Sequence, residues 1–370
     1  MSTPPFKQMV TDNSFNPEIF SLNTAEGKKK YEQLLHQNNA VVYDTILSQL
    51  KELIKIKNPS QKFTENQLKE KIAEYLDGTD ADSYGNWVYY PWSNKLVHVL
   101  NEEDFIAVRT NRNLYKITPE AITELRTKKI AIIGLSVGQS IAQTIATERI
   151  CGELRLADFD TLELANLNRL NAGLQDLGLP KVIIAARKIA ETDPYIKVKC
   201  WPEGIHENNI EAFLTDGGNV DVLVEECDGL DMKILSRLVA REHNIPVVMD
   251  TNDMGMLDIE RFDLEPDRPL FHGRTPELEN KNKSELLSEL KNLSIEQKII
   301  HLSSIIGMEN VSEEMKQSLP YMNITITGWP QLASAVMLGA AMITDTCRRI
   351  LLNQITRSGR YFVDFNTLIH

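Results

Sequence analysis

Apolar residues recur at helical spacing in the first part of the chain. Between residues 28 and 76 they predict two helical stretches, one marked by Val42, Ile46 and Leu50 and the next by Leu68 and Ile72. Aromatic and β-branched residues on both sides of a Pro-Trp-Ser-Asn turn predict a hairpin over residues 85–100. Residues 1 to about 25 are polar and contain three prolines, and we expect them to form an irregular arm.

After this hairpin, Asn101 predicts the N-cap of a short helix that ends near Val108. The pattern then changes at Lys128. A short apolar run at residues 128–134 comes first, and four further strand-like segments follow at residues 153–158, 196–201, 220–226 and 245–250, separated by stretches of helical periodicity. Such runs are typical of strands buried on both faces, and their alternation with helices indicates parallel strands joined by crossover helices.

A last helix over residues 330–352 is rich in Ala, Leu and Met and should pack on this sheet. We therefore expect an α/β fold with a Rossmann-like, mostly parallel sheet and flanking helices over residues 105–370. A smaller α+β N-terminal domain should precede it over residues 1–104. Within the larger domain, residues 275–320 predict an insert of two or three amphipathic helices, because leucines mark one face and Ser294 with Gln297 forms a capping box.

The composition narrows the class of protein. The 370 residues carry a formal net charge of −12, so the chain lacks the overall basic field that drives non-specific binding to nucleic acids or membranes. No apolar run approaches the ~20 residues that span a bilayer, and the first residues lack the apolar core of a secretory signal. The four cysteines are scattered without a C-x-x-C pair, which indicates a reduced compartment and argues against a zinc site. We expect a soluble, cytoplasmic protein.

The first strand-to-helix turn is a candidate phosphate site. Gly134, Ser136 and Gly138 lie where a parallel strand meets the N-terminus of a helix, and backbone N–H groups point outward there. Asp158 follows the second strand, 24 residues after Gly134, close to the spacing at which an acid meets a ribose hydroxyl. These four residues therefore predict a nucleotide site, although a tight turn and a solvated acid would give the same pattern.

Three segments in order make the assignment more specific. Residues 158–160 are Asp-Phe-Asp, residues 165–169 are Ala-Asn-Leu-Asn-Arg, and residues 176–181 are Asp-Leu-Gly-Leu-Pro-Lys. They resemble the D-x-D, N-L-x-R-Q and D-x-G-x-x-K pattern of the ThiF/MoeB/HesA family, the bacterial relatives of ubiquitin-activating enzymes, with Leu170 in place of the usual Gln. Two flanking segments, residues 109–113 and 225–229, are similar to the family's R-Y-x-R-Q and D-x-x-D-N.

The resemblance implies an ATP-dependent adenylyltransferase that activates a carboxylate as an acyl-adenylate and releases pyrophosphate. Arg112, Arg169 and Lys181 would neutralise charge on the phosphate oxygens, since two anions must approach each other in this reaction. Asp228 would hold Mg²⁺. Asn166 would bind a phosphate or the ribose, and Asp158 the ribose hydroxyls. The family also implies a homodimer in which Arg112 reaches the ATP of the partner subunit.

Two features depart from the family pattern. The glycine loop is one residue shorter than G-x-G-G-x-G, which leaves open a non-catalytic scaffold of the same fold. The stretch between Asp250 and Gly328 has no cysteine, so no enzyme thioester or persulfide forms at the family's usual place, and the zinc-binding C-x-x-C pairs are missing. The substrate remains open among the C-terminus of a peptide or ubiquitin-like protein, the modified base of a tRNA threonylcarbamoyladenosine dehydratase, and a free small acid. A NAD- or FAD-dependent oxidoreductase is a further alternative, but it predicts a G-x-G-x-x-G turn.

Overall fold

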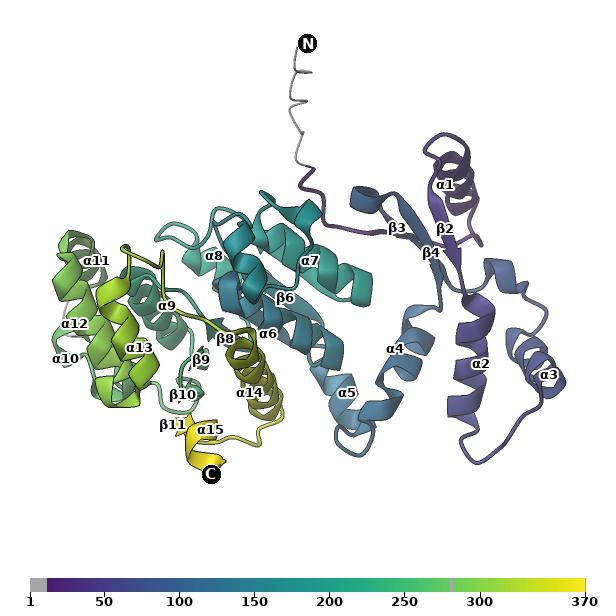
Figure 1. Cartoon of the computed structure of the whole chain (residues 1–370). Helices are drawn as coiled ribbons and strands as arrows, with labels where there is room; N and C mark the ends of the chain where they lie inside the picture. Colours follow the sequence, from purple (N-terminus) through teal and green to yellow (C-terminus); the bar gives the residue numbers. More distant parts are fainter. Residues whose placement is uncertain (1–11, 280–281, 370) are drawn as a thin grey trace, which may run out of the picture. The chain divides into compact units, whose positions relative to one another are not determined.

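The computed structural model describes residues 12–279 and 282–369, and the chain divides into two compact units (Figure 1). The first unit comprises residues 1–119 together with residues 190–195, and the second comprises residues 120–189 and 196–370. The boundary after residue 104 that the sequence suggests stays a prediction.

The first unit contains a four-stranded sheet with the order β1-β3-β4-β2. β3 pairs with both β1 and β4 in antiparallel fashion, whereas β2 lies parallel to β4. The strands are β1 (Glu18–Phe20), β2 (Val41–Asp44), β3 (Asn86–Tyr90) and β4 (Lys95–Val99). The helices are α1 (Ala25–His36), α2 (Ile46–Lys57), α3 (Glu65–Leu76) and α4 (Glu102–Thr110). Apolar residues of α2 and α3 form a buried cluster.

The structure confirms the hairpin of residues 85–100 and corrects two expectations in this unit. Asn101 caps α4 as predicted, since its Oδ1 accepts the N–H of Asp104 at 3.0 Å. Val42 does not belong to a helix, because it lies in the edge strand β2. This strand directly precedes α2, so Val42 and the apolar residues of α2 together give a helical spacing in the sequence. Part of the arm is also regular, since β1 pairs with β3; residues 1–11 lie outside the described residues.

The second unit is built on a seven-stranded sheet with the order β11-β10-β9-β8-β5-β6-β7. The five predicted runs form β5 (Lys129–Ile133), β6 (Glu153–Ala157), β7 (Lys197–Trp201), β8 (Val222–Glu225) and β9 (Val247–Thr251), all parallel. The strand order reverses between β5 and β8, and such a switch point is where ligands bind in open α/β sheets. The mostly parallel α/β sheet is therefore confirmed.

Helices cover both faces of this sheet (Figure 1). α6 (Leu135–Glu148) packs on the face to which Ile132 points, and α14 (Ala333–Leu351) packs beside α6. Ala131 and Ile133 point to the other face, into a cluster with buried residues of α8 (Ile210–Thr215), α9 (Leu230–Glu242) and α11 (Lys283–Asn292). α7 (Lys181–Thr192) is the crossover helix between β6 and β7, and its last residues belong to the first unit, whereas α5 (Pro119–Leu125) precedes β5.

Two further strands and the insert complete the second unit. β10 (Met256–Glu260) and β11 (Gly359–Phe362) extend the sheet in antiparallel fashion, and the sequence did not predict them. The insert consists of α10 (Pro276–Glu279), α11, α12 (Ile295–Ile306) and α13 (Glu313–Ser318), and α15 (Phe365–Leu368) follows β11. Leu286, Leu287 and Leu290 are buried, and Ser294 forms the predicted capping box with Gln297. Among the described residues, no helix has the length and apolarity to cross a membrane.

Candidate functional site

The turn between β5 and α6 requires glycine at two positions for different reasons. Gly134 has φ +85°, and a Cβ built there would lie 2.5 Å from the carbonyl oxygen of Glu226, so backbone from β8 blocks any side chain. A Cβ at Gly138 would lie 2.8 Å from Ile132 Cγ2, so Gly138 allows α6 to pack closely on β5. The turn therefore places the N-terminus of α6, with its positive dipole end, at the switch point of the sheet.

Asp158, at the end of β6, holds this turn in place. Its Oδ2 accepts the N–H of Leu135 at 2.5 Å, and its Oδ1 accepts the N–H of Asp160 at 2.8 Å. Burial raises the pKa of Asp158, whereas these two hydrogen bonds and the charge of Lys181 oppose the rise. Both carboxylate oxygens thus bind backbone amides, and the predicted contact of Asp158 with a ribose stays a prediction.

Lys181 joins the turn to the acidic segment that follows β6. It is the first residue of α7 and is only 4% exposed. Its Nζ donates to Ser136 Oγ at 2.9 Å and to Asp160 Oδ2 at 2.8 Å. Asp160, whose side chain is half-exposed, received no role in the sequence analysis. The structure thus brings Ser136, Asp160 and Lys181 together at the N-termini of two helices.

Arg169 and Asp228 interact electrostatically beside this group. Arg169 follows the short helix Leu164–Asn168, and its Nη1 donates to Asn168 Oδ1 at 2.8 Å. Burial lowers the pKa of Arg169, and the carboxylate of Asp228 opposes the change. The Nε of Arg169 is buried and finds no hydrogen-bond partner within the described residues, so it can donate to a bound group. Asn166 accepts the N–H of Glu163 at 3.0 Å and so caps this short helix.

Asp228 lies in the loop between β8 and α9. It is exposed, yet the surrounding protein reduces its solvation and raises its pKa, whereas the charges of Lys233, Arg169 and Lys181 oppose the rise. No three His, Cys, Asp or Glu side chains are grouped as metal ligands in residues 12–279 and 282–369. A single carboxylate fits Mg²⁺ that arrives with a nucleotide, since Mg²⁺ is usually held by one or two carboxylates plus phosphate oxygens. Arg169, Lys181 and the N-terminus of α6 fit the phosphates.

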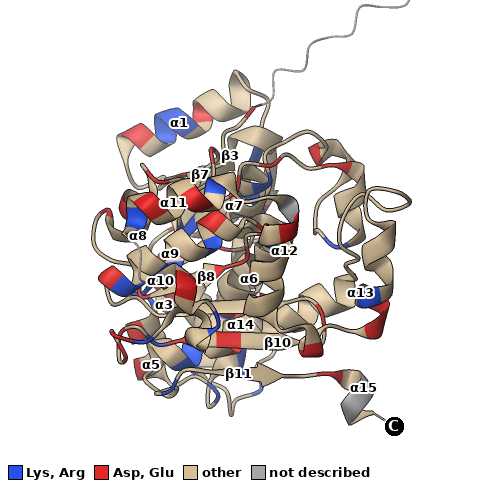
Figure 2. Cartoon of the chain, turned by 90° about the vertical axis from the view of Figure 1, so that its left-hand side faces the viewer, with Lys and Arg blue, Asp and Glu red and all other residues tan. Residues whose placement is uncertain are grey.

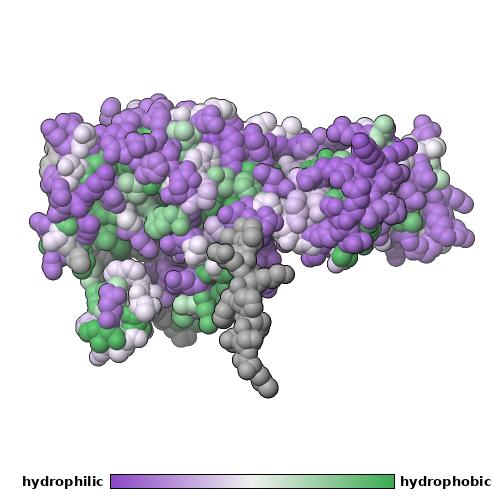
Figure 3. Space-filling view, turned by 90° about the horizontal axis from the view of Figure 1, so that it is seen from above, coloured by the Kyte–Doolittle hydropathy of each residue, from purple (hydrophilic) through white to green (hydrophobic). Residues whose placement is uncertain are grey.

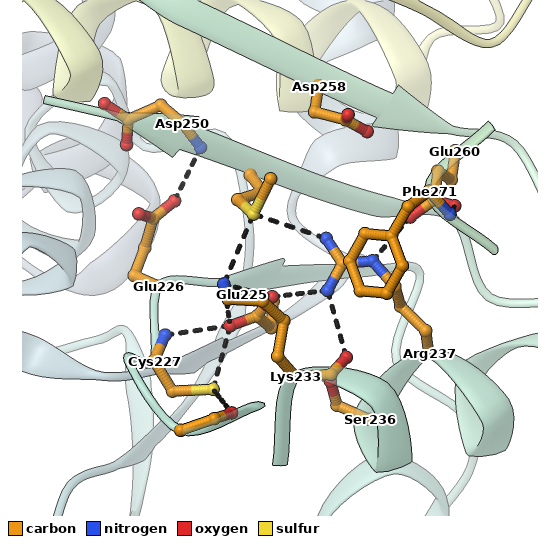
Figure 4. A network of polar contacts seen from close by, with 12 residues as sticks. Glu225, Glu226, Cys227, Lys233, Ser236, Arg237, Asp250, Asp258, Glu260 and Phe271 are labelled. Carbon is orange, nitrogen blue, oxygen red and sulfur yellow. Dashed lines mark hydrogen bonds and ion pairs between the residues drawn. The ribbon is translucent and has the colours of Figure 1, made fainter. Parts of the chain in front are cut away.

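A buried charge network next to the loop between β8 and α9 was not predicted from the sequence (Figure 4). The carboxylate of Glu225 contacts Lys233 Nζ at 2.9 Å and forms a short ion pair with Arg237, all three being almost fully buried. Burial alone would raise the pKa of Glu225, but the two cations outweigh it and lower this pKa to about 2. The only sequence signal is the spacing of Lys233 and Arg237, four residues apart on one face of α9.

Arg112, the remaining predicted residue, belongs to the first unit. It lies in the short helix Asn111–Asn113 directly after α4 and is exposed. Its neighbour Arg109 is held by an ion pair with Asp193 of the same unit, with Nη1 3.2 Å from Oδ2.

Part of the sequence matches a known protein family. Residues 108–255 match the ThiF family, so the chain carries a ThiF-family domain, and the resemblance drawn from the motifs is confirmed. An uncharacterized protein of Mycobacterium tuberculosis is 41% identical over 283 residues, which are 76% of this chain and 38% of the relative. The tRNA threonylcarbamoyladenosine dehydratase of Bacillus subtilis is 27% identical over 42% of this chain and 60% of its own length.

The chain thus spans less than two thirds of the length of these relatives. Among solved structures, the Escherichia coli tRNA N6-threonylcarbamoyladenosine dehydratase in complex with ATP superposes with a TM-score of 0.48 at 15% identity. That match covers 70% of this chain and all of the other.

Proposed function

We propose that this ThiF-domain chain is an ATP-dependent adenylyltransferase that activates a carboxylate as an acyl-adenylate and releases pyrophosphate. The observation that carries the proposal is the grouping of Arg169, Lys181 and Asp228 around the N-terminus of α6 at the switch point of the sheet. Two fixed cations and a helix N-terminus match the charge of a triphosphate, and Asp228 matches its metal ion.

Each residue of the site has a separate role in this proposal. The N-terminus of α6 and Ser136 bind phosphate oxygens, and Lys181 is held against Ser136 by its ion pair with Asp160. Arg169, whose Nε has no hydrogen-bond partner among the described residues, would place its charge near the phosphate that the carboxylate attacks. Asp228 would hold Mg²⁺, which when bound offsets charge between phosphate oxygens. Fixed cations favour the reaction because they are oriented before the negative charge is redistributed.

The acyl group passes directly to its acceptor in this proposal, without an enzyme thioester at the family's usual place. No cysteine lies between Asp250 and Gly328. Cys227 is next to Asp228, but burial and the carboxylate of Glu225 raise the pKa of its thiol well above the usual value. A neutral thiol is a poor nucleophile. Direct use of the acyl-adenylate fits a small acid or a modified tRNA base better than a ubiquitin-like protein.

A tRNA threonylcarbamoyladenosine dehydratase-like activity is the second candidate, and the Bacillus subtilis relative favours it. A tRNA substrate requires a basic surface that neutralises phosphates. Figure 2 shows Lys interspersed with Glu on α11 and α13 of the second unit. On these helices the charges are mixed, so the free small acid remains the first candidate.

We also propose a homodimer in a cytoplasmic setting, with Arg112 reaching the site of the partner subunit. Green apolar areas interrupt the hydrophilic surface on the left of Figure 3, in the second unit. The exposed apolar residues of this unit include Ile324, Trp329, Leu332 and Met337, which are 44% to 77% exposed. Burial of such side chains by a second copy would supply the association energy.

Substitutions test the site and the dimer separately. Arg169→Ala or Asp228→Ala should abolish the conversion of ATP to AMP and pyrophosphate, while the far-UV circular dichroism stays as in the wild type. Retained turnover in either variant would remove that residue from the mechanism. A mixture of Arg112→Ala and Asp228→Ala chains should regain part of the activity if Arg112 acts in trans. No recovery would favour an Arg112 that acts within its own subunit.

A further inference from the structure

One carboxylate, that of Glu225, holds the loop between β8 and α9 that carries Asp228, and Figure 4 shows its contacts with Cys227 and Lys233. Glu225 Oε1 accepts the N–H of Cys227 at 2.9 Å and contacts Cys227 Sγ at 2.9 Å. The same oxygen accepts from Lys233 Nζ at 3.0 Å, and Oε2 accepts from Lys233 Nζ at 2.9 Å. Glu225 therefore binds the residue before Asp228 and the helix after it at the same time.

Lys233 closes the loop from the side of α9. Its backbone N–H donates to the carbonyl oxygen of Gly229 at 2.8 Å, and its Nζ lies 3.3 Å from Met249 Sδ in β9. The residues between Glu225 and Lys233 thus form a loop and the first turn of α9. The buried ion pair between Glu225 and Lys233 connects the two ends of this segment. Removal of Glu225 takes away the ion-pair partner of the buried Lys233, whereas removal of Lys233 leaves Glu225 with Arg237 as its partner.

A second layer fixes the orientation of this pair. Arg237 forms a short ion pair with Glu225, and its Nε donates to Glu260 Oε2 at 2.5 Å. Glu260 Oε1 accepts the N–H of Phe271 at 2.6 Å, and the ring of Phe271 lies 4.2 Å from the guanidinium of Arg237. Glu225, Arg237 and Glu260 are all 0% exposed, so these contacts are made without competition from water.

We propose that Glu225 and Lys233 are positioning residues for Asp228, and that their buried ion pair sets the Mg²⁺-dependent part of the affinity for ATP. The proposal rests on the proposed function, because it concerns the same metal ligand. The Mg²⁺-dependent part of ATP binding should therefore respond to this ion pair, whereas phosphate binding should not. The groups that would hold the phosphates, Ser136 and Lys181, are fixed by other contacts and do not depend on this pair.

The test is ATP binding by isothermal titration calorimetry, with Mg²⁺ and with EDTA, on the full chain. The variant is Glu225→Gln with Lys233→Met, which removes both buried charges and keeps the volume. We expect the tightening of ATP binding by Mg²⁺ to fall by about tenfold, the lower end of the effect of residues that support metal ligands. Binding in EDTA should stay within about twofold of the wild type.

The matched control is Glu153→Gln with Arg155→Met, a second buried pair of the same sheet, with Arg155 Nε 2.9 Å from Glu153 Oε1 and Arg155 0% exposed. It touches none of the proposed site residues, so both affinities should stay unchanged. Glu225→Asp is the second variant: it keeps the charge but shortens the reach by one methylene, and it decides the question if the double variant fails to fold.

The outcomes separate the two claims. A wild type without Mg²⁺-dependent ATP binding would overturn the proposed function, and the positioning role would fall with it. A wild type with such binding, and variants that keep it in full, would overturn the positioning role alone. Equal loss of affinity in Mg²⁺ and in EDTA would show that Glu225 and Lys233 support the whole site, which also contradicts the proposal.

Discussion

Asp250 carries a buried carboxylate whose environment makes the stability of the protein depend on pH. It lies in β9, is 5% exposed, and neither of its oxygens has a hydrogen-bond partner among the described residues. A Cβ at Gly339 of α14 would lie 2.0 Å from Asp250 Oδ2, so the carboxyl group packs directly on that helix. Burial raises the pKa of Asp250 to about 7, although Glu226 and Lys233 oppose the rise.

Asp250→Asn should therefore stabilise the fold, and more so as the pH rises. In the unfolded chain this carboxyl titrates near 3.8, whereas in the fold it keeps its proton up to about pH 7. The contribution of Asp250 to stability is thus fully present below about pH 4 and is lost as the pH rises to 7. A full pH unit within this window costs about 1.4 kcal/mol, and the cost levels off near pH 7, so between pH 5 and pH 7 the advantage of the variant should grow by about 2 kcal/mol.

Urea unfolding at pH 5, 6, 7 and 8, followed by tryptophan fluorescence, measures this difference. Asp216→Asn is the control, because it removes an acid whose side chain is 68% exposed and pairs with Lys199 at the surface, so it should change the free energy of unfolding by less than about 1 kcal/mol. Parallel pH profiles for the wild type and Asp250→Asn would refute the argument, because they would mean that Asp250 is ionised in the fold.

Three further substitutions follow from local geometry. Gly134→Ala should destabilise the second unit by about 3 to 5 kcal/mol, since it adds the strain of a positive φ to a clash with the backbone of Glu226. Thermal denaturation measures this loss, and an unchanged Tm would contradict it. Lys181→Met should slow turnover on the order of 10²-fold, because a fixed cation is lost from the phosphates, and a rate near wild type would remove Lys181 from the site. Thr64→Ala should lower the free energy of unfolding by about 1 kcal/mol through loss of the capping box of α3. Amide hydrogen exchange should become faster in that helix alone, and equal exchange in the variant and the wild type would argue against the cap.

The parallel core of the fold could be predicted because most of its strands are buried on both faces. β5, β8 and β9 appear in the sequence as largely apolar runs, and the helices between the strands have the length of crossover connections. β10 did not follow this pattern. Its Asp258 and Glu260 interrupt the apolar residues but are 1% and 0% exposed, since Arg237, Arg360 and His272 pair with them. A charge looks solvent-exposed in sequence unless its distant partner is known.

The site was predictable to the extent that its residues form local motifs. The segments around Asp158, Arg169 and Lys181 lie within one stretch of chain, and the structure brings Lys181, at the start of α7, to Ser136, at the start of α6. The Glu225 network could not be predicted, because Glu260 and Phe271 reach Arg237 from elements 23 and more residues away. The same limit applies to Asp250, whose contact with Gly339 joins β9 to α14.

Isotope exchange of pyrophosphate into ATP tests the central claim most directly. The assay contains the full chain, Mg²⁺ and separate pools of small acids, peptides, ubiquitin-like proteins and tRNA. Adenylation predicts exchange that depends on one carboxylate pool and disappears in Arg169→Ala, because only reversible formation of an acyl-adenylate returns pyrophosphate to ATP. No exchange with any pool, together with no measurable ATP binding, would contradict adenylation and indicate that the short glycine turn supports a scaffold instead.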